Sequence, residues 1–180
     1  RSLLVDKALE CCTENELSSW HCNFVLADEE PALGNADLLS RHDWQFHWHN
    51  NGYRSFEDFM GELKSRKRKA IRRERRRVHE QGIEFQWRSG CELSESDLDY
   101  IYQCYTSTFA LYGNYPALTP QFFTSIADKL AHQVQVVFAV RNQQKIAMGF
   151  FLSGGGRLYG RYWGCTEEWS GLHFETAYYQ

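Results

Sequence analysis

The sequence lacks the features that mark several common classes of protein. Its six cysteines include no CxxC pair, and no cysteines and histidines are spaced as metal ligands. Secreted disulfide scaffolds are shorter than this 180-residue chain and richer in cysteine. No apolar run reaches the 18 residues that a membrane-spanning helix needs. These absences predict no metal site, no membrane span, and a cytoplasmic protein whose thiols are reduced and mostly buried.

Acidic residues are almost missing from one stretch of the chain. Residues 64–77 read KSRKRKAIRRERRR, in which ten positions are Lys or Arg and only Glu74 is acidic. This local charge of +9 leaves −12 for the remainder of a chain whose formal charge is −3. Such asymmetry favours a localised anion-binding surface. The alternatives are a solvated helix face, or an intramolecular match with the acidic remainder.

The rest of the composition is that of a folded domain. A chain of 180 residues can bury a sizeable core, and 43% hydrophobic with 16% aromatic residues argues against disorder. The first residue is Arg rather than Met, and the last ten, GLHFETAYYQ, read as the start of a helix. We therefore expect a single domain over residues 1–180, excised from a longer chain.

Hydrophobic periodicity and turn signals predict a mixture of helices and strands. Helices are expected over residues 3–11, over 55–63 continuing through the basic stretch to 81–82, over 94–113, over 119–130 and from 170 onward, with a short helix or loop at 29–41. Strands are expected over residues 19–27, 44–50, 83–89, 134–141, 145–153 and 157–164. Short turns separate the last three strands, which predicts an antiparallel meander. The pattern is typical of an α/β (α+β) domain with a mixed sheet flanked by helices.

Two capping signatures mark helix starts. Ser55 precedes Asp58 by three residues, and Ser94 precedes Asp97 in the same way. Gly113 suits the end of the helix that begins near Ser94.

The basic stretch has an amphipathic pattern when it is placed on a helix at 100° per residue. A stripe of about one third of the circle contains Leu63, Lys67, Ala70, Ile71, Glu74 and Val78. The remaining positions carry Arg66, Arg68, Lys69, Arg72, Arg73, Arg75, Arg76 and Arg77. The pattern therefore predicts a docked helix with Lys67 and Glu74 turned inward, where an ionisable group needs a partner or a task.

Three stretches, QFHWHNNGYRSFEDFMGELKSRKRKAIRRER, LYGRYWGCTEE and LHFETAYYQ, resemble the bacterial FemAB-like family of N-acyltransferases. These proteins are linked to peptidoglycan biosynthesis or recognition and belong to the GNAT superfamily. The resemblance covers about residues 40–180, and the helix with Ser65, Lys67, Arg68 and Arg72 is similar to the Lys/Arg-rich helix of Fem-type aminoacyltransferases. It implies a GNAT-like, mostly antiparallel sheet whose central strands splay to open a cleft.

The resemblance also implies a reaction class. Relatives transfer an aminoacyl group from aminoacyl-tRNA, or an acyl group from acyl-CoA, to an amine, so either is a donor substrate and no tightly bound cofactor is expected. The GNAT pyrophosphate loop, Q/R-x-x-G-x-G/A, is absent, which disfavours acyl-CoA. A strand beyond residue 180 would pair with residues 157–164. Without it we expect an open sheet edge, filled by a homodimer or by a strand from the chain's own N-terminal half.

Candidate site residues follow from the expected faces of the strands. His47 lies on the polar face of strand 44–50 as a general base or as an exposed strand residue. Arg161 shares a face with Arg157, Tyr159 and Trp163. It is expected to contact a ligand anion or stabilise an oxyanion, to form a buried salt bridge, or to lie exposed. Gly160 and Gly164, on the opposite face, indicate close packing.

The final helix and the basic stretch supply the other candidates. His173 and Glu175 open the final helix, where the resemblance implies phosphate binding, and Glu175 is either catalytic or a partner of the helix dipole. The anion-binding set is Lys67, Arg68, Arg72, Arg73, Arg76, Glu74, Tyr159, Trp163 and His173. We expect a transferase whose basic helix holds a polyanion, such as tRNA or the pyrophosphate of a cell-wall precursor. The alternative is a non-catalytic module that binds nucleic acid, an anionic membrane or another polyanion through residues 64–77.

Overall fold

A computed structural model describes residues 2–34 and 38–180. The sequence predicts one domain over residues 1–180, whereas contacts divide the chain into two compact units, residues 1–51 and 52–180. The described part of the first unit contains the helices α1 (Ser2–Glu14) and α2 (Glu30–Gly34). The helix predicted over residues 3–11 is therefore confirmed, and a short helix forms within 29–41.

Neither strand predicted in the first unit forms. Residues 19–27 and 44–50 are irregular, and the side chains of Trp44 and Phe46 are 86% and 96% exposed. A strand needs a neighbour for its backbone hydrogen bonds, and the described part of this unit contains no other strand. The half-buried strand predicted at residues 44–50 is therefore wrong, and so is the polar strand face that singled out His47.

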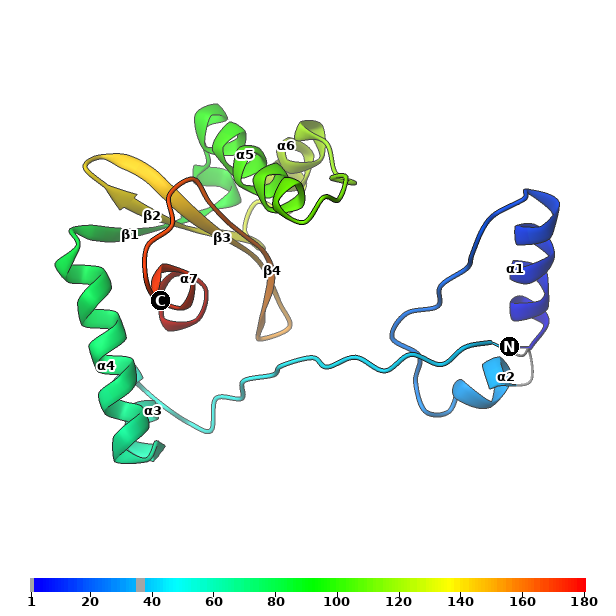
Figure 1. Cartoon of the computed structure of the whole chain (residues 1–180), viewed down its shortest axis with the longest axis horizontal. Helices are drawn as coiled ribbons and strands as arrows, with labels where there is room; N and C mark the ends of the chain where they lie inside the picture. Colours follow the sequence, from blue (N-terminus) through cyan, green and yellow to red (C-terminus); the bar gives the residue numbers. More distant parts are fainter. Residues whose placement is uncertain (1, 35–37) are drawn as a thin grey trace. The chain divides into compact units, whose positions relative to one another are not determined.

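The second unit is built on a four-stranded antiparallel sheet in the order β1-β2-β3-β4 (Figure 1). The strands are β1 (Ile83–Ser89), β2 (Val134–Arg141), β3 (Gln144–Gly154) and β4 (Arg157–Cys165). The four strands predicted here are confirmed, as is the meander of the last three. The predicted fold class, α+β with an antiparallel sheet flanked by helices, is confirmed as well.

Helices α5 (Glu95–Leu111) and α6 (Pro120–Lys129) cover one face of the sheet (Figure 1). The turn η1 (Gly90–Glu92) connects β1 to α5. Alternate β2 residues point into this layer because successive strand side chains face opposite ways. The buried cluster consists of Ile101, Cys104, Tyr105, Phe123, Val134, Val136, Phe138, Met148 and Phe150.

The other face is covered by α4 (Ser65–Glu80) and by one continuous helical segment, α7 (Leu172–Phe174) followed by the π-helical η2 (Glu175–Tyr179). Its buried cluster consists of Val78, Ile83, Ala139, Ile146, Ala147 and Leu172. Helical structure predicted from residue 170 onward is thus confirmed. This second layer brings the basic helix α4 beside the segment that carries Glu175.

Capping groups start the helices where the sequence predicts. The Ser94 side chain accepts a hydrogen bond from the Asp97 backbone N–H, and Asp97 accepts one from the Ser94 N–H. In α3 (Phe56–Glu62) the Ser55 side chain accepts from the Asp58 N–H at 3.1 Å. The Asp58 carboxylate, however, accepts from the Arg54 N–H rather than from Ser55.

The helix that begins after Ser55 does not continue into the basic stretch. Leu63 has extended backbone angles (φ −80°, ψ 147°), and α4 begins only after Lys64. The Arg68 side chain donates to the Gly61 carbonyl oxygen at 3.0 Å, which satisfies one carbonyl at the end of α3. The prediction of one continuous helix is therefore wrong, because the backbone is not helical at Leu63 and Lys64. Met60 and Val78, both fully buried, belong to separate helices.

Strand β4 lies at the edge of the sheet and pairs only with β3 in the described residues. The predicted open edge is therefore confirmed. Phe150 pairs with Tyr162 and Phe151 with Gly160, so Arg161 is the extra residue of a β-bulge. The bulge interrupts the strict alternation that the sequence predicts along this strand.

The bulge separates two side chains that were expected on one face. Tyr159 pairs with Leu152, which packs on the α5 side, whereas Trp163 stacks on His173 of α7. Gly160 pairs with Phe151. A Cβ added at position 160 would lie 3.8 Å from the Phe151 ring, which is an ordinary van der Waals distance. The predicted close packing is therefore confirmed at Gly164 and wrong at Gly160.

The cysteines and helix lengths test two further expectations. All six thiols are free, but only Cys104 is buried, so the expectation of mostly buried thiols is wrong. In the part of the chain that the structure describes, no helix is both long and apolar enough to cross a bilayer.

Candidate anion-binding site

Helix α4 places most of its positive charge on the side away from the sheet. Val78 is fully buried and Ile71 half-buried, so these two define the docked side. The exposed basic side chains for which the described residues supply no ion pair are Lys64, Arg66, Lys67, Lys69, Arg73, Arg76 and Arg77. Cations three and four residues apart repel one another along a helix, and an external anion would relieve that repulsion.

The two ionisable residues predicted to turn inward behave differently. Glu74 is half-buried and accepts a hydrogen bond from the Tyr179 hydroxyl at 3.4 Å, which confirms the prediction. Lys67 is exposed, so the prediction is wrong for it. The α7–η2 segment reaches the C-terminal half of α4, and Lys67 lies about two turns before Glu74, beyond that cover.

Arg75, expected on the outer face, turns inward instead. Its Nε donates to both carboxylate oxygens of Glu175, at 3.0 and 3.2 Å, and its side chain is 27% exposed. Its guanidinium carbon lies 4.3 Å from the centre of the Phe56 ring on α3, within cation–π range. Arg75 thus contacts both neighbours of α4 and is withdrawn from the outer surface.

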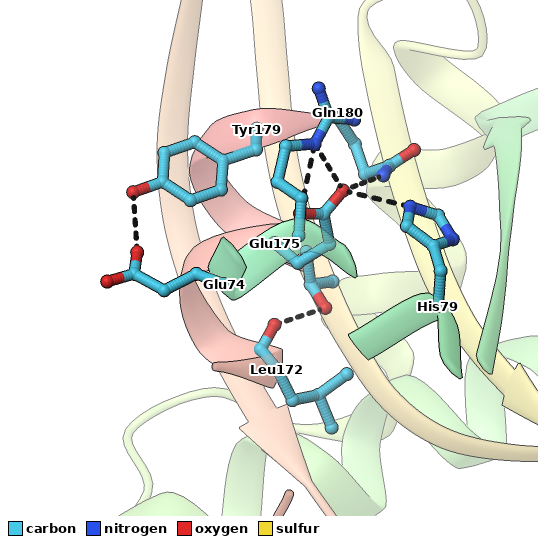
Figure 2. Close-up of polar contacts among 8 residues, drawn as sticks. Glu74, His79, Leu172, Glu175, Tyr179 and Gln180 are labelled. Atoms are coloured by element: carbon cyan, nitrogen blue, oxygen red, sulfur yellow. Dashed lines mark hydrogen bonds and ion pairs between the residues drawn. The ribbon is translucent and has the colours of Figure 1, made fainter. Parts of the chain in front are cut away.

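Glu175 is the buried centre of this cluster (Figure 2). It is 1% exposed, and besides Arg75 it accepts from Gln180 Nε2 at 2.6 Å and lies 3.6 Å from His79 Nε2. A buried carboxylate is tolerated only when such partners replace water. Its position makes Glu175 a link between α4 and η2 whose carboxylate is shielded from solvent.

Two arginines of the expected anion-binding set are held by α3. Arg72 Nη2 lies 2.6 Å from a carboxylate oxygen of Glu57, and Arg68 caps α3 as described above. Both side chains of the Arg72–Glu57 pair are more than half exposed, and such pairs contribute only about 0–1 kcal/mol. Arg72 can therefore exchange Glu57 for a stronger anionic partner, whereas Arg73 and Arg76 need not exchange anything.

A cluster of aromatic rings lies beside Trp163 on β4. The His173 ring stacks on the Trp163 ring, with the two ring centroids 4.7 Å apart. The rings of Phe174 and Tyr178 each have their centroid 5.7 Å from that of His173. Partial desolvation lowers the pKa of His173 below its ordinary value. The lowered pKa favours the neutral imidazole, which would meet a ligand as a hydrogen-bonding group.

One family model matches the chain, described as FemAB-like, peptidoglycan biosynthesis/recognition, over residues 1–180. The chain belongs to the FemAB-like family. The resemblance that the sequence carries over about residues 40–180 is thereby confirmed and extends over the first unit. No curated protein matches the chain significantly.

Two other candidates in this FemAB-like chain, His47 and Arg161, belong to segments other than the basic helix. His47 lies exposed in the first unit, where its Nε2 is 3.2 Å from Gln45 Oε1. Arg161 is exposed on the bulge, with its guanidinium carbon 5.4 Å from the centre of the Tyr162 ring and no ion pair in the described residues. The buried salt bridge considered for Arg161 is therefore wrong, while its ligand-binding role and the catalytic role of His47 stay predictions.

Sequence reasoning missed four members of the Glu175 cluster and its surroundings: Phe56, Arg75, His79 and Gln180. The contact of Arg75 with Glu175 joins residues 100 apart in the sequence, beyond any local spacing rule. One signal was nonetheless present. Glu175 stands three residues after Leu172 on the same helical face, so a buried carboxylate in need of a cation was to be expected.

Proposed function

We propose that this FemAB-like chain is part of an N-acyltransferase that moves an acyl or aminoacyl group onto an amine, in the context of peptidoglycan precursors. The observation that carries the proposal is the outer face of α4, where most of the exposed cations have no ion-pair partner among the described residues, in a chain that the family model matches over residues 1–180. A polyanionic substrate would lie along this face. Family membership favours a transferase over a module that only binds.

Aminoacyl-tRNA suits the length of the cationic face better than a smaller donor. Helix α4 has 16 residues and is therefore about 24 Å long, enough for several consecutive phosphates of an RNA strand. A pyrophosphate would occupy only a small part of it. The missing pyrophosphate-binding loop also counts against acyl-CoA.

The proposed reaction is attack of an amine nitrogen on the ester carbonyl of the donor. A new C–N bond forms and the C–O bond to the donor breaks. The base takes a proton from the amine and passes it to the departing oxygen, so the donor leaves as a neutral hydroxyl. The tetrahedral intermediate carries an oxyanion, which a positive or hydrogen-bonding group stabilises. His47 is the base expected from the sequence and Arg161 the expected oxyanion partner, and both assignments are part of the proposal.

The test is a transfer assay with the full-length protein. Isotopically labelled aminoacyl-tRNA and acyl-CoA are offered separately, together with a muropeptide that has a free amine, and products are identified by mass spectrometry. We expect labelled muropeptide from aminoacyl-tRNA. Binding of RNA through α4 without transfer from either donor would instead support the non-catalytic polyanion-binding alternative, because α4 presents the same cations in both cases.

A further inference from the structure

The Arg75–Glu175 pair is the most buried of the polar links that join α4 to its helical neighbours α3 and η2. Arg75 belongs to α4, Glu175 begins η2, and the Phe56 ring under the Arg75 guanidinium belongs to α3. The contact of Phe56 with Tyr179, whose ring centres are 6.1 Å apart, closes this arrangement. Arg75 is therefore the one α4 side chain that the described contacts place against both helical neighbours at once, with its partner carboxylate fully buried.

Stability alone does not explain a buried ion pair at this place. Apolar residues of similar volume often stabilise a protein as well as a buried pair does, because burying two charges costs desolvation free energy. Unlike an apolar contact, an ion pair restricts the orientation of its side chains, because both carboxylate oxygens of Glu175 must face the Arg75 guanidinium. Arg75 is thus held at one angle around the axis of α4.

Fixing the angle of Arg75 fixes the direction of every other residue on α4, because consecutive residues are 100° apart. Arg73, Arg76 and Arg77, which have no ion pair in the described residues, are set outward by the same contact. A rigid row of cations loses less conformational entropy on binding than a helix that rocks. Glu175 would therefore favour polyanion binding by holding the outward cations of α4 in a fixed orientation.

We propose that Glu175 is a positioning residue: through Arg75 it sets the rotation of α4 and so preorganises the outer cationic face for a polyanion. This inference rests on the proposed function and deepens it. It assigns Glu175 a task that does not require contact with substrate, in agreement with its burial.

The sign of the effect separates positioning from simple electrostatics. Replacing Glu175 by Gln removes a negative charge beside a cationic surface, so electrostatics alone predicts tighter polyanion binding. Loss of preorganisation predicts weaker binding. The number of phosphates contacted stays the same, because every outward cation is retained, so the dependence of log Kd on log salt should keep its slope.

The experiment measures binding of a labelled 20-nucleotide oligo-dT to the full-length protein across a salt series. We expect Glu175→Gln to weaken binding about five- to tenfold with an unchanged salt slope, and Glu175→Asp to restore part of the affinity. Glu57→Gln is the matched control, because it removes an exposed acid paired with α4 and should leave binding unchanged or tighter. Arg73→Gln should instead reduce the salt slope by about 0.7.

A second measurement does not depend on binding. Hydrogen exchange of α4 amides should be faster in Glu175→Gln than in Glu57→Gln. If Glu175→Gln fails to fold, the double variant Arg75→Met/Glu175→Met has no unpaired buried charge and should show the same loss of affinity. Unchanged or tighter binding by a Glu175 variant overturns the positioning role alone. Absence of oligo-dT binding by the unmodified protein overturns the proposed anion site as well.

Discussion

Gly164 of β4 lies directly against the backbone of Cys104 on α5. A Cβ at position 164 would be 2.4 Å from the Cys104 carbonyl oxygen, closer than real contacts allow. In the same place Thr108 Oγ1 donates to the Trp163 carbonyl oxygen at 2.9 Å. Helix α5 therefore packs on β4 backbone to backbone, which only glycine permits.

Gly164→Ala should lower the free energy of unfolding by about 1–3 kcal/mol, the usual cost of overpacking a close contact. Gly160→Ala, on the same strand, is the control, because its Cβ would have no neighbour nearer than 3.8 Å. Its effect should stay within about 0.5 kcal/mol. Urea denaturation of both variants provides the comparison, and equal losses would contradict the packing described at Gly164.

Reversing Arg72, Arg73 and Arg76 to Glu should abolish polyanion binding while leaving the fold intact. All three side chains are exposed, and only Arg72 has an ion-pair partner among the described residues. Each reversal removes one phosphate contact and adds a repelling charge. Lys129→Glu, at the end of α6 on the other face of the sheet, is the control and should bind normally. A thermal melt of the triple variant verifies folding, and retained binding would show that α4 is not the anion site.

Asp97 should make folding stability depend on pH in the acid range. Burial acts to raise its pKa, but hydrogen bonds from Lys145 and Ser94 outweigh that effect and hold the pKa below its ordinary value. Because the folded pKa is the lower one, the contribution is complete above the unfolded pKa of about 3.9 and is lost as pH falls through the folded value.

Asp97→Asn should therefore cost about 1–3 kcal/mol at pH 7, since it removes an acceptor from a partly buried pair with Lys145. The difference from the unmodified protein should shrink at pH 3. Asp99→Asn, two residues further along α5 and exposed, should change little at either pH. Chemical denaturation at the two pH values measures both, and a difference that grows on acidification would contradict the assigned pKa direction.

The stack of His173 on Trp163 should be visible in the titration of the imidazole. NMR should give His173 a pKa below the ordinary value of about 6.5, because its stacked ring is partly removed from water. Trp163→Ala should raise the pKa toward that value. Trp87→Ala, which removes a ring that contacts Phe151 instead, should leave it unchanged.

The same shift has a consequence for stability. The unfolded chain takes up the His173 proton at higher pH than the folded protein does, so protonation favours unfolding. His173 therefore has no effect well above pH 6.5 and destabilises the fold as pH falls through that value. A His173 pKa at or above 6.5 in the folded protein would show that the stack does not desolvate the ring.

The sequence predicted the second unit well because its signals there are local and mutually supporting. The meander of β2, β3 and β4 follows from apolar runs with short turns between them, and the start of α5 follows from its capping box. The strand expected at residues 44–50 failed for the opposite reason. Alternating side chains describe a strand only if another strand pairs with it, and none forms in the described part of the first unit.

Helix α4 shows where periodicity stops being informative. The angular pattern correctly predicted that Glu74 and Val78 face inward. It could not show that the α7–η2 segment reaches only the C-terminal half of α4, so the inward position predicted for Lys67 is wrong. It also placed Arg75 outside, because Arg75 falls beyond the edge of the apolar stripe and a helical pattern cannot include a carboxylate 100 residues away in the sequence. The bulge at Arg161 is a similar case, since register depends on the partner strand.

The open edge of β4 leads to a prediction about association of the 180-residue chain. In the described residues β4 pairs on one side only, and Leu158 and Tyr159 on it are 54% and 48% exposed. Unpaired backbone groups on an apolar edge favour pairing with another strand, although the bulge and Arg157 oppose it. We expect a reversible homodimer in which two β4 strands pair. Leu158→Lys should abolish it, because a lysine on the edge keeps a second strand away.

Size-exclusion chromatography with light scattering over a range of protein concentrations measures this association. Leu111→Lys is the matched control, since Leu111 is 73% exposed at the end of α5 and lies outside the strand edge, and it should leave the dimer intact. If both variants lose the dimer equally, its interface lies elsewhere. A strictly monomeric chain at all concentrations would mean that the bulge and the arginines are enough to protect the edge.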